Sequence, residues 1–113
     1  MVTDPNLAPG SDGPYYVIVD VDIRDVPRYL TYMEKVRPAL EAAGGRYLAR
    51  GGAFTTYEGS WEPSRLVLIE LPSQKAWESF YYGAAYEGIK IIRDETSTAN
   101  IIGLEGLPPT GTR

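Results

Sequence analysis

The chain has 113 residues, contains no cysteine or histidine, and carries a formal net charge of −4 at pH 7. The missing cysteines exclude disulfides, thiolate nucleophiles and zinc–thiolate sites, and the missing histidines remove the commonest general base and the usual haem ligand. The negative charge disfavours nucleic acid and anionic membrane surfaces as partners. With no membrane-length apolar run and no secretory signal at the N-terminus, we expect a cytoplasmic protein of one domain.

The first half of the chain predicts a strand, a helix and a second strand. β-Branched and aromatic residues over 15–23 are typical of a strand, and apolar residues then recur at helical spacing over 26–43. Pro38 should bend that helix. A short strand follows over 46–50, and residues 53–58 either extend it or form a small hairpin arm.

The second half repeats this order. Residues 65–71 predict a strand, Ser73 caps a helix that Gly83 interrupts, residues 84–93 form a further helical piece, and residues 99–105 form the last strand. The order βαββαβ indicates an α+β, ferredoxin-like fold with a four-stranded antiparallel sheet.

The domain is expected to span 15–105, between flexible tails at 1–14 and 106–113 that are rich in Pro and Gly.

One face of the predicted sheet is left without helices. We expect the third strand at the sheet centre, beside the first and parallel to it, with the fully apolar strand faces against the helices. The opposite face carries several apolar side chains, namely Ile18, Leu66, Leu68, Ile102 and Leu104. Because an apolar patch of this size seldom stays in water, we expect a homodimer that packs two sheets together.

Several segments resemble one known family. They are YVIVDVDI with a Tyr-rich helix after it, PALEAAGGRYLARGG, EGSWEPSRLVLIELPS and AYEGI, with EGL after the closing strand. Over about residues 15–107 these segments resemble the family named domain of unknown function DUF1330, in the dimeric α/β-barrel superfamily. The resemblance implies the fold and the dimer, but no reaction. The wider superfamily includes cofactor-free monooxygenases, isomerases, cyclases, haem-degrading enzymes and dehydratases, and the missing histidine speaks against the haem-dependent ones.

Asp20 and Glu70 are the first candidate catalytic residues. On adjacent parallel strands they would lie at a similar height on one sheet face, where repulsion would keep one carboxyl protonated as an acid beside a base. The alternative is that each carboxylate pairs with an arginine at the dimer interface.

Arg50 and Arg65 are the second pair. Arg50 ends one strand and Arg65 begins the next, so antiparallel pairing brings them together, with Arg46 nearby. They are suited to holding a carboxylate, enolate or phenolate, and the alternative is that they neutralise Glu58, Glu70 or Asp20.

Aromatic residues are the third set, since the chain has nine Tyr and two Trp. We expect five residues to bind a substrate: Tyr32, Trp61, Tyr81, Tyr86 and Asn100. The alternative is that the aromatic rings fill the core and the dimer seam, and that Asn100 makes a hydrogen bond at the start of its strand. Tyr29 and Trp77 are expected to fill the core. Arg93 and Asp94 are expected to pair with each other at the surface.

These residues favour a small-molecule enzyme that uses acid/base chemistry without a metal or another cofactor. It would be a cyclase, isomerase, lyase or cofactor-free oxygenase acting on a compact aromatic or polyketide-like substrate. A homodimer that binds a small ligand without catalysis, or has a purely structural role, is the alternative.

Overall fold

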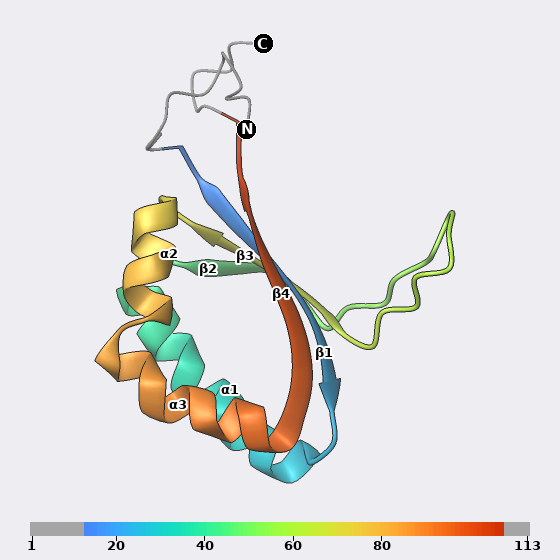
Figure 1. The fold of residues 1–113 in the computed structure, drawn as a ribbon, viewed down its shortest axis with the longest axis horizontal. Coiled ribbons are helices and arrows are strands. Elements are labelled where there is room, and N and C mark those ends of the chain that lie inside the picture. The colour runs from blue at the N-terminus through green and yellow to red at the C-terminus, as the bar shows by residue number, and fades with distance from the viewer. Residues whose placement is uncertain (1–12, 108–113) are drawn as a thin grey trace.

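The computed structural model describes residues 13–107, so residues 1–12 and 108–113 of the two expected tails lie outside the described residues. The described elements follow the predicted order, with the second helix divided in two (Figure 1). They are β1 (Tyr15–Ile23), α1 (Val26–Ala42), β2 (Arg46–Arg50), β3 (Leu66–Leu71), α2 (Gln74–Tyr81), α3 (Ala84–Thr96) and β4 (Ser97–Glu105). At the two ends of this region, the amide of Gly106 donates a hydrogen bond to the carbonyl of Pro14 over 2.8 Å.

The four strands form one antiparallel sheet in the order β2-β3-β1-β4, which confirms the ferredoxin-like α+β fold. The prediction that the first and third strands run parallel is wrong, because β1 pairs with β3 in an antiparallel register. The reason lies in the connections. The α1 crossover leaves β1 and β2 pointing the same way, and β3 lies between them and returns from β2, so it opposes both.

The helices cover one face of the sheet, as predicted (Figure 1). On that face, Val17 and Leu71 are fully buried and Val21 is 1% exposed. Helix α1 contributes residues at helical spacing, and its buried side chains are Tyr29, Tyr32, Val36 and Leu40. The core therefore lies between α1, α2, α3 and the inner sheet face.

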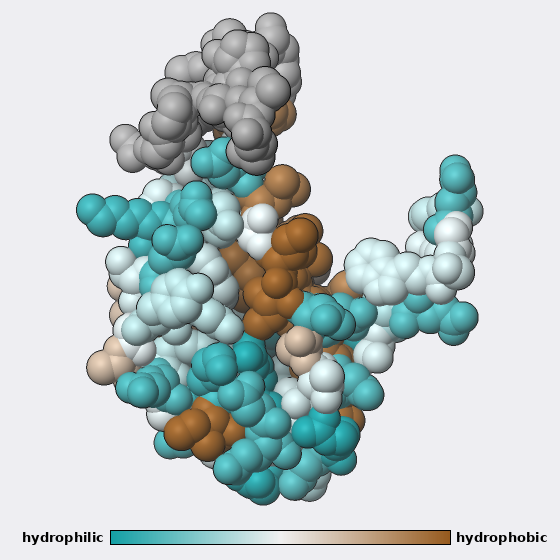
Figure 2. All heavy atoms as spheres, in the orientation of Figure 1, coloured by the Kyte–Doolittle hydropathy of each residue, from teal (hydrophilic) through white to brown (hydrophobic). Residues whose placement is uncertain are grey.

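The opposite sheet face has no helix over it. Ile102 and Leu104 on β4 are 64% and 58% exposed, and Ile18, Leu66 and Leu68 are half-buried. In Figure 2, hydrophobic residues gather along the sheet on the side between the body and the projecting arm. The predicted apolar outer face is thus present in the single chain.

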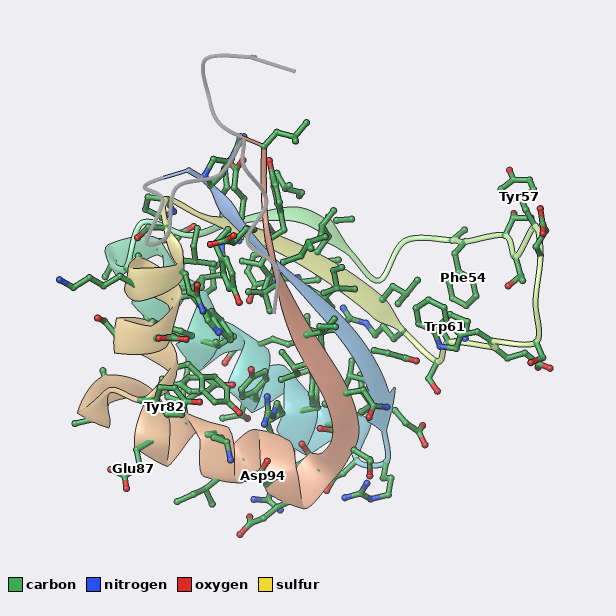
Figure 3. All side chains as sticks on the ribbon, turned by 45° about the horizontal axis from the view of Figure 1, so that its top comes forward. Phe54, Tyr57, Trp61, Tyr82, Glu87 and Asp94 are labelled. Carbon is green, nitrogen blue, oxygen red and sulfur yellow. The ribbon has the colours of Figure 1, made fainter. Side chains whose placement is uncertain are left out.

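Residues 51–65 form an arm that projects away from the body (Figure 1). The structure assigns no strand to this segment, so the expected extension of β2 over 53–58 is absent and the arm alternative holds. Figure 3 shows Phe54, Tyr57 and Trp61 along it, far from the helices. The bulge in this region lies earlier, between Tyr47 and Ala49.

Helices α2 and α3 meet at Gly83, which breaks the helical region as predicted. A Cβ atom at this position would lie 2.5 Å from the carbonyl oxygen of Ser79, so only glycine fits without a shift. Helix α3 continues to Thr96, beyond the predicted end at 93, because the Thr96 and Ser97 hydroxyls satisfy carbonyls of its last turn. No helix within residues 13–107 is both long and apolar enough to cross a membrane.

Candidate functional site

A pocket lies between the helices and the inner face of the sheet. The pocket is partly open and contains a cavity of about 50 Å³. Its walls are mainly apolar and aromatic side chains from α1, α2, α3 and the sheet. Five of its lining residues are tyrosine or tryptophan: Tyr29, Tyr32, Tyr47, Trp77 and Tyr86. Three arginines complete the lining, and no Asp or Glu is among its residues.

Arg50 and Arg65 reach the pocket from the two ends of the arm. Arg50 is the last residue of β2 and Arg65 directly precedes β3, so the antiparallel pairing of these strands brings them together as predicted. Neither guanidinium forms an ion pair with any residue of the described region. The expected alternative, that they neutralise nearby carboxylates, is therefore not what the structure shows.

The surroundings of Arg50 are apolar on one side. Its guanidinium carbon lies 4.4 Å from the centre of the Tyr47 ring, within the range of a cation–π contact. Its Nη1 atom is buried and has no hydrogen-bond partner within residues 13–107. Buried donors without partners are rare and costly in proteins, so this atom marks a place where an acceptor would be stabilised.

Arg93 of α3 is the third pocket arginine, and the prediction that it lies at the surface is wrong. Its Nη2 atom lies 3.3 Å from Asp94 Oδ1, so the expected pair exists, but Arg93 itself is only 8% exposed. Figure 3 shows Asp94 on the outer side of α3. The short sequence spacing suggested a surface pair, whereas the helical turn directs Arg93 inward and leaves Asp94 outside.

Tyr32 and Tyr86 share a hydrogen bond inside the pocket, with their hydroxyl oxygens 2.8 Å apart. Burial raises the pKa of both phenols above the usual value. Burial also raises the pKa of Tyr29, an effect that the positive charges of Arg65 and Arg93 partly offset. The hydroxyls are therefore neutral at physiological pH and can donate hydrogen bonds to a ligand.

Asp20 and Glu70 do not come together. In the antiparallel register Asp20 faces Leu66 and Glu70 faces Tyr16, which separates them by four residues, or about 13 Å at the usual rise per strand residue. Both lie on the outer sheet face, as expected, and neither lines the pocket. The acid–base pair inferred from parallel strands therefore has no geometric basis.

Each of the two carboxylates has its own structural partners. Glu70 Oε1 accepts from Arg46 Nε over 2.7 Å across neighbouring strands, which is the expected arginine pairing but within one chain. Asp20 Oδ1 accepts from the amides of Ser64 and Arg65 at 2.9 and 3.4 Å, and its Oδ2 accepts from Trp61 Nε1 at 3.2 Å. Asp20 thus anchors the base of the arm rather than pairing with an arginine side chain.

The remaining candidates divide between the two sides of the molecule. Tyr81 stacks on Trp77 with ring centres 5.1 Å apart and contacts Tyr86 beside the pocket. Trp61 lies on the arm with 59% of its surface exposed, and Asn100 is opposite Asp20 on β4, on the outer face. The predicted binding residues therefore do not form one site.

Sequence reasoning missed Tyr47 and Arg93 as pocket residues and treated Tyr29 as core. The helical spacing of Tyr29, Tyr32 and Val36 does place all three on one face of α1, and the same spacing puts Arg93 seven residues after Tyr86 on α3. That periodicity was the available signal for Arg93.

A family described as a domain of unknown function, DUF1330, matches residues 14–107. No curated protein shows significant similarity to the chain.

Several solved structures share the fold. A protein of unknown function from Rhodopseudomonas palustris has a TM-score of 0.70 and 19% identity, covering 87% of this chain and 85% of its own. A candidate antibiotic biosynthesis monooxygenase from Nitrosomonas europaea has a TM-score of 0.53 and 20% identity, covering 88% and 96%. A conserved protein of unknown function from Bacteroides thetaiotaomicron, described as a possible oxidoreductase, has a TM-score of 0.51 and 14% identity, covering 84% and 99%.

Proposed function

The chain belongs to the DUF1330 family, and we propose that it is a homodimeric small-molecule enzyme whose active site is the pocket between the helices and the sheet. The reaction there is acid/base chemistry on a compact substrate, by a cyclase, isomerase, lyase or cofactor-free oxygenase, and the pocket side chains stabilise the charge that develops. The similarity to the monooxygenase candidate from Nitrosomonas europaea is consistent with this class of reaction but concerns the fold alone.

One observation carries the proposal: Arg50 and Arg65 reach a partly open, mainly apolar pocket without any ion-pair partner in the described region. Positive groups held in advance where negative charge develops are among the largest contributors to enzymatic rate. Their cost in folding is repaid only when an anion or a developing oxyanion is present. This is the expected arrangement for stabilising an enolate or phenolate.

The tyrosine pair supplies a hydrogen-bond donor for the reacting oxygen. Of two hydroxyls that share one hydrogen bond, one donates and the other keeps its proton free for a ligand. We therefore assign this role to Tyr32 and Tyr86 and place no catalytic role on Asp20 and Glu70, which face the other side of the sheet.

Enolisation illustrates the step. The C–H bond beside a substrate carbonyl breaks, its proton passes to water, and the electron pair moves to the carbonyl oxygen as an enolate. Arg50 and Arg65 hold this oxygen, and a tyrosine hydroxyl donates a hydrogen bond to it. Return of a proton from water to the carbon restores the ketone.

Deuterium exchange tests the proposal without a known substrate. The protein is incubated in D₂O with compact 2-keto acids, 3-keto acids and small dialkyl ketones, and the loss of C–H signals is followed by NMR. We expect exchange faster than in buffer for at least one compound, with Arg65→Met and Tyr86→Phe each reducing the rate by about 10-fold to 1,000-fold. Arg46→Met, which removes a guanidinium outside the pocket, is the matched control and should leave the rate unchanged.

A ligand-binding protein without catalysis is the second candidate. The absence of Asp and Glu from the pocket lining favours it, because no strong base faces the cavity. Saturable binding of these compounds with no exchange above buffer for any of them would establish this alternative and overturn the enzyme assignment.

The homodimer is part of the proposal because the outer sheet face needs a cover. Ile102 and Leu104 are more than half exposed there, and a second copy offers a matching apolar face through two-fold symmetry. The arm adds to this surface, since Phe54 is 45% and Trp61 59% exposed on a segment that stands away from its own body (Figure 3). We propose that the arm packs against the partner beside the sheet interface.

A further inference from the structure

We propose that the pocket binds a short-chain monocarboxylate, with its carboxylate between Arg50 and Arg65 and its alkyl end against the apolar wall. This inference rests on the proposed location of the site and names the class of ligand that the site takes. It is carried by the charge, the unfilled hydrogen-bonding capacity and the size of the pocket.

The charge of the pocket requires an anion. Arg50, Arg65 and Arg93 line it, and guanidinium groups stay protonated in proteins. Of these three arginines, only Arg93 forms an ion pair within the described residues, with Asp94 outside the pocket. The chain as a whole has a net charge of −4, so this gathering of cations runs against its overall charge. Arg50 and Arg65 are half-buried and have no ion-pair partner within the described residues, and a single negative ligand would supply one.

The geometry at the base of the arm favours a flat, two-oxygen group. Arg50 Nη1 is buried and has no acceptor within the described residues. The Arg65 guanidinium packs so closely on Gly51 that a Cβ atom there would lie 2.7 Å from its Nε atom. Gly51 also has a φ of +70°, so the backbone turns at this point to admit the guanidinium. A carboxylate can accept from two guanidinium groups at once, since each of its oxygens has two lone pairs.

The size and the walls of the cavity limit the rest of the ligand. A volume of about 50 Å³ corresponds to roughly four water-sized groups, at 10–15 Å³ for each. Beyond the arginines and tyrosines the walls are aliphatic or aromatic, and include Val36, Leu40 and Ile69. Acetate and propanoate match this space, whereas benzoate exceeds it. Phosphate is disfavoured for another reason, because losing its strong hydration beside an apolar wall costs free energy.

Titration of the full-length protein tests the inference directly. Acetate, propanoate, benzoate, phosphate and the neutral analogue propanamide are added in a buffer free of other carboxylates, and binding is followed by amide chemical shifts in NMR. We expect saturable binding of acetate and propanoate, with dissociation constants on the order of 1 mM for so few atoms. Benzoate, phosphate and propanamide should bind at least 10-fold more weakly.

Variants of the pocket arginines test where the ligand binds. Arg50→Met and Arg65→Met should each weaken propanoate binding by at least 10-fold, and Arg50→Lys should weaken it less because it keeps the charge. Arg46→Met, on the same strand but paired with Glu70, should bind as the wild-type protein does. The near-ultraviolet circular dichroism of each variant reports whether the aromatic pocket is still folded, and Arg50→Lys remains informative if a Met variant unfolds.

Two results would overturn the inference: propanamide or phosphate binding as tightly as propanoate, or equal loss of binding in Arg46→Met and Arg50→Met. These results are distinguishable from failure of the proposed function. Carboxylate binding without any deuterium exchange refutes the enzyme assignment alone, and exchange of a neutral ketone without carboxylate binding refutes the ligand class alone.

Discussion

The hydroxyl oxygens of Tyr32 and Tyr86 lie 2.8 Å apart, although the residues are 54 positions apart in the chain. This bond joins α1 to α3 across the pocket, and the two rings also meet edge to face with centres 6.5 Å apart. The pocket wall and the packing of the two helices therefore depend on the same side chains. A change at either tyrosine is expected to affect both stability and the site.

Because Tyr32 and Tyr86 are buried, we predict that the protein loses stability in alkaline solution. Because burial raises the pKa of Tyr32 and Tyr86, the folded protein retains protons that the unfolded chain releases above about pH 10. These groups contribute fully to the free energy of unfolding below pH 10. Their contribution then falls as the pH rises, by up to about 1.4 kcal/mol per pH unit for each tyrosine. Urea unfolding between pH 8 and 11 measures this slope.

Tyr32→Phe should make that alkaline slope shallower, whereas Tyr57→Phe, at a residue 90% exposed on the arm, should leave it as in the wild type. Equal slopes in the wild type and Tyr32→Phe would contradict the assignment of the effect to the buried pair.

We predict that the hydrogen bonds of Asp20 keep the base of the arm ordered. Its carboxylate accepts from Ser64, Arg65 and Trp61, so Asp20→Ala should release the base of the arm. Hydrogen exchange at the Ser64 and Arg65 amides is expected to rise by about 10-fold, since hydrogen bonds to a charged acceptor are among the stronger ones. Asp20→Asn keeps an acceptor oxygen and should show a smaller increase. Unchanged exchange in Asp20→Ala would mean that other contacts fix the arm.

We predict that substitution of Glu70 has little effect on the free energy of unfolding or on the rate of deuterium exchange. Its ion pair with Arg46 lies at the surface, where Arg46 is 71% exposed, so Glu70→Gln should change the free energy of unfolding by no more than about 1 kcal/mol. Deuterium exchange by the protein should also stay at the wild-type rate, because Glu70 does not line the pocket. A large loss of exchange in Glu70→Gln, with the fold intact, would return Glu70 to the catalytic role that the sequence suggested.

From the exposed apolar side chains of the outer sheet face, we predict that the protein is a dimer in solution. Light scattering at micromolar concentration should give twice the chain mass of 12.5 kDa, and Ile102→Glu should give a single chain because it places a charge in the interface. Ile91→Glu is the control, since Ile91 is 53% exposed on α3, on the helical side of the molecule. A monomeric wild type, or a dimer that Ile102→Glu leaves intact, would contradict the sheet-to-sheet dimer.

Most of the fold was predictable from local patterns. Alternation over Tyr15–Ile23 and helical spacing from Tyr29 to Leu40 determine which faces are apolar, and these faces are buried as expected. The strand directions were not read correctly, because periodicity fixes the face of a side chain but not the direction of a neighbouring strand. Because of that error, Asp20 and Glu70 were predicted to lie close together. The antiparallel register of the structure separates them.

The site was predictable only in part. Arg50 and Arg65 follow from hairpin pairing, which is a local relation, and both line the pocket. Arg93 could have been found from its helical spacing to Tyr86. Tyr47 shares the inner face with Arg50 because of the register shift between Tyr47 and Ala49, which the sequence does not display. Trp61 looked like a binding residue because large aromatic side chains often are, but its place was set by the direction of the arm.

A crystal structure of the protein grown with propanoate tests the central claim most directly, since that claim is the location of the site. We predict ligand density in the pocket between the helices and the sheet, with carboxylate oxygens within about 3 Å of the Arg50 and Arg65 guanidinium groups. Density on the outer sheet face beside Asp20 or Glu70, with the pocket left without ligand, would contradict the account.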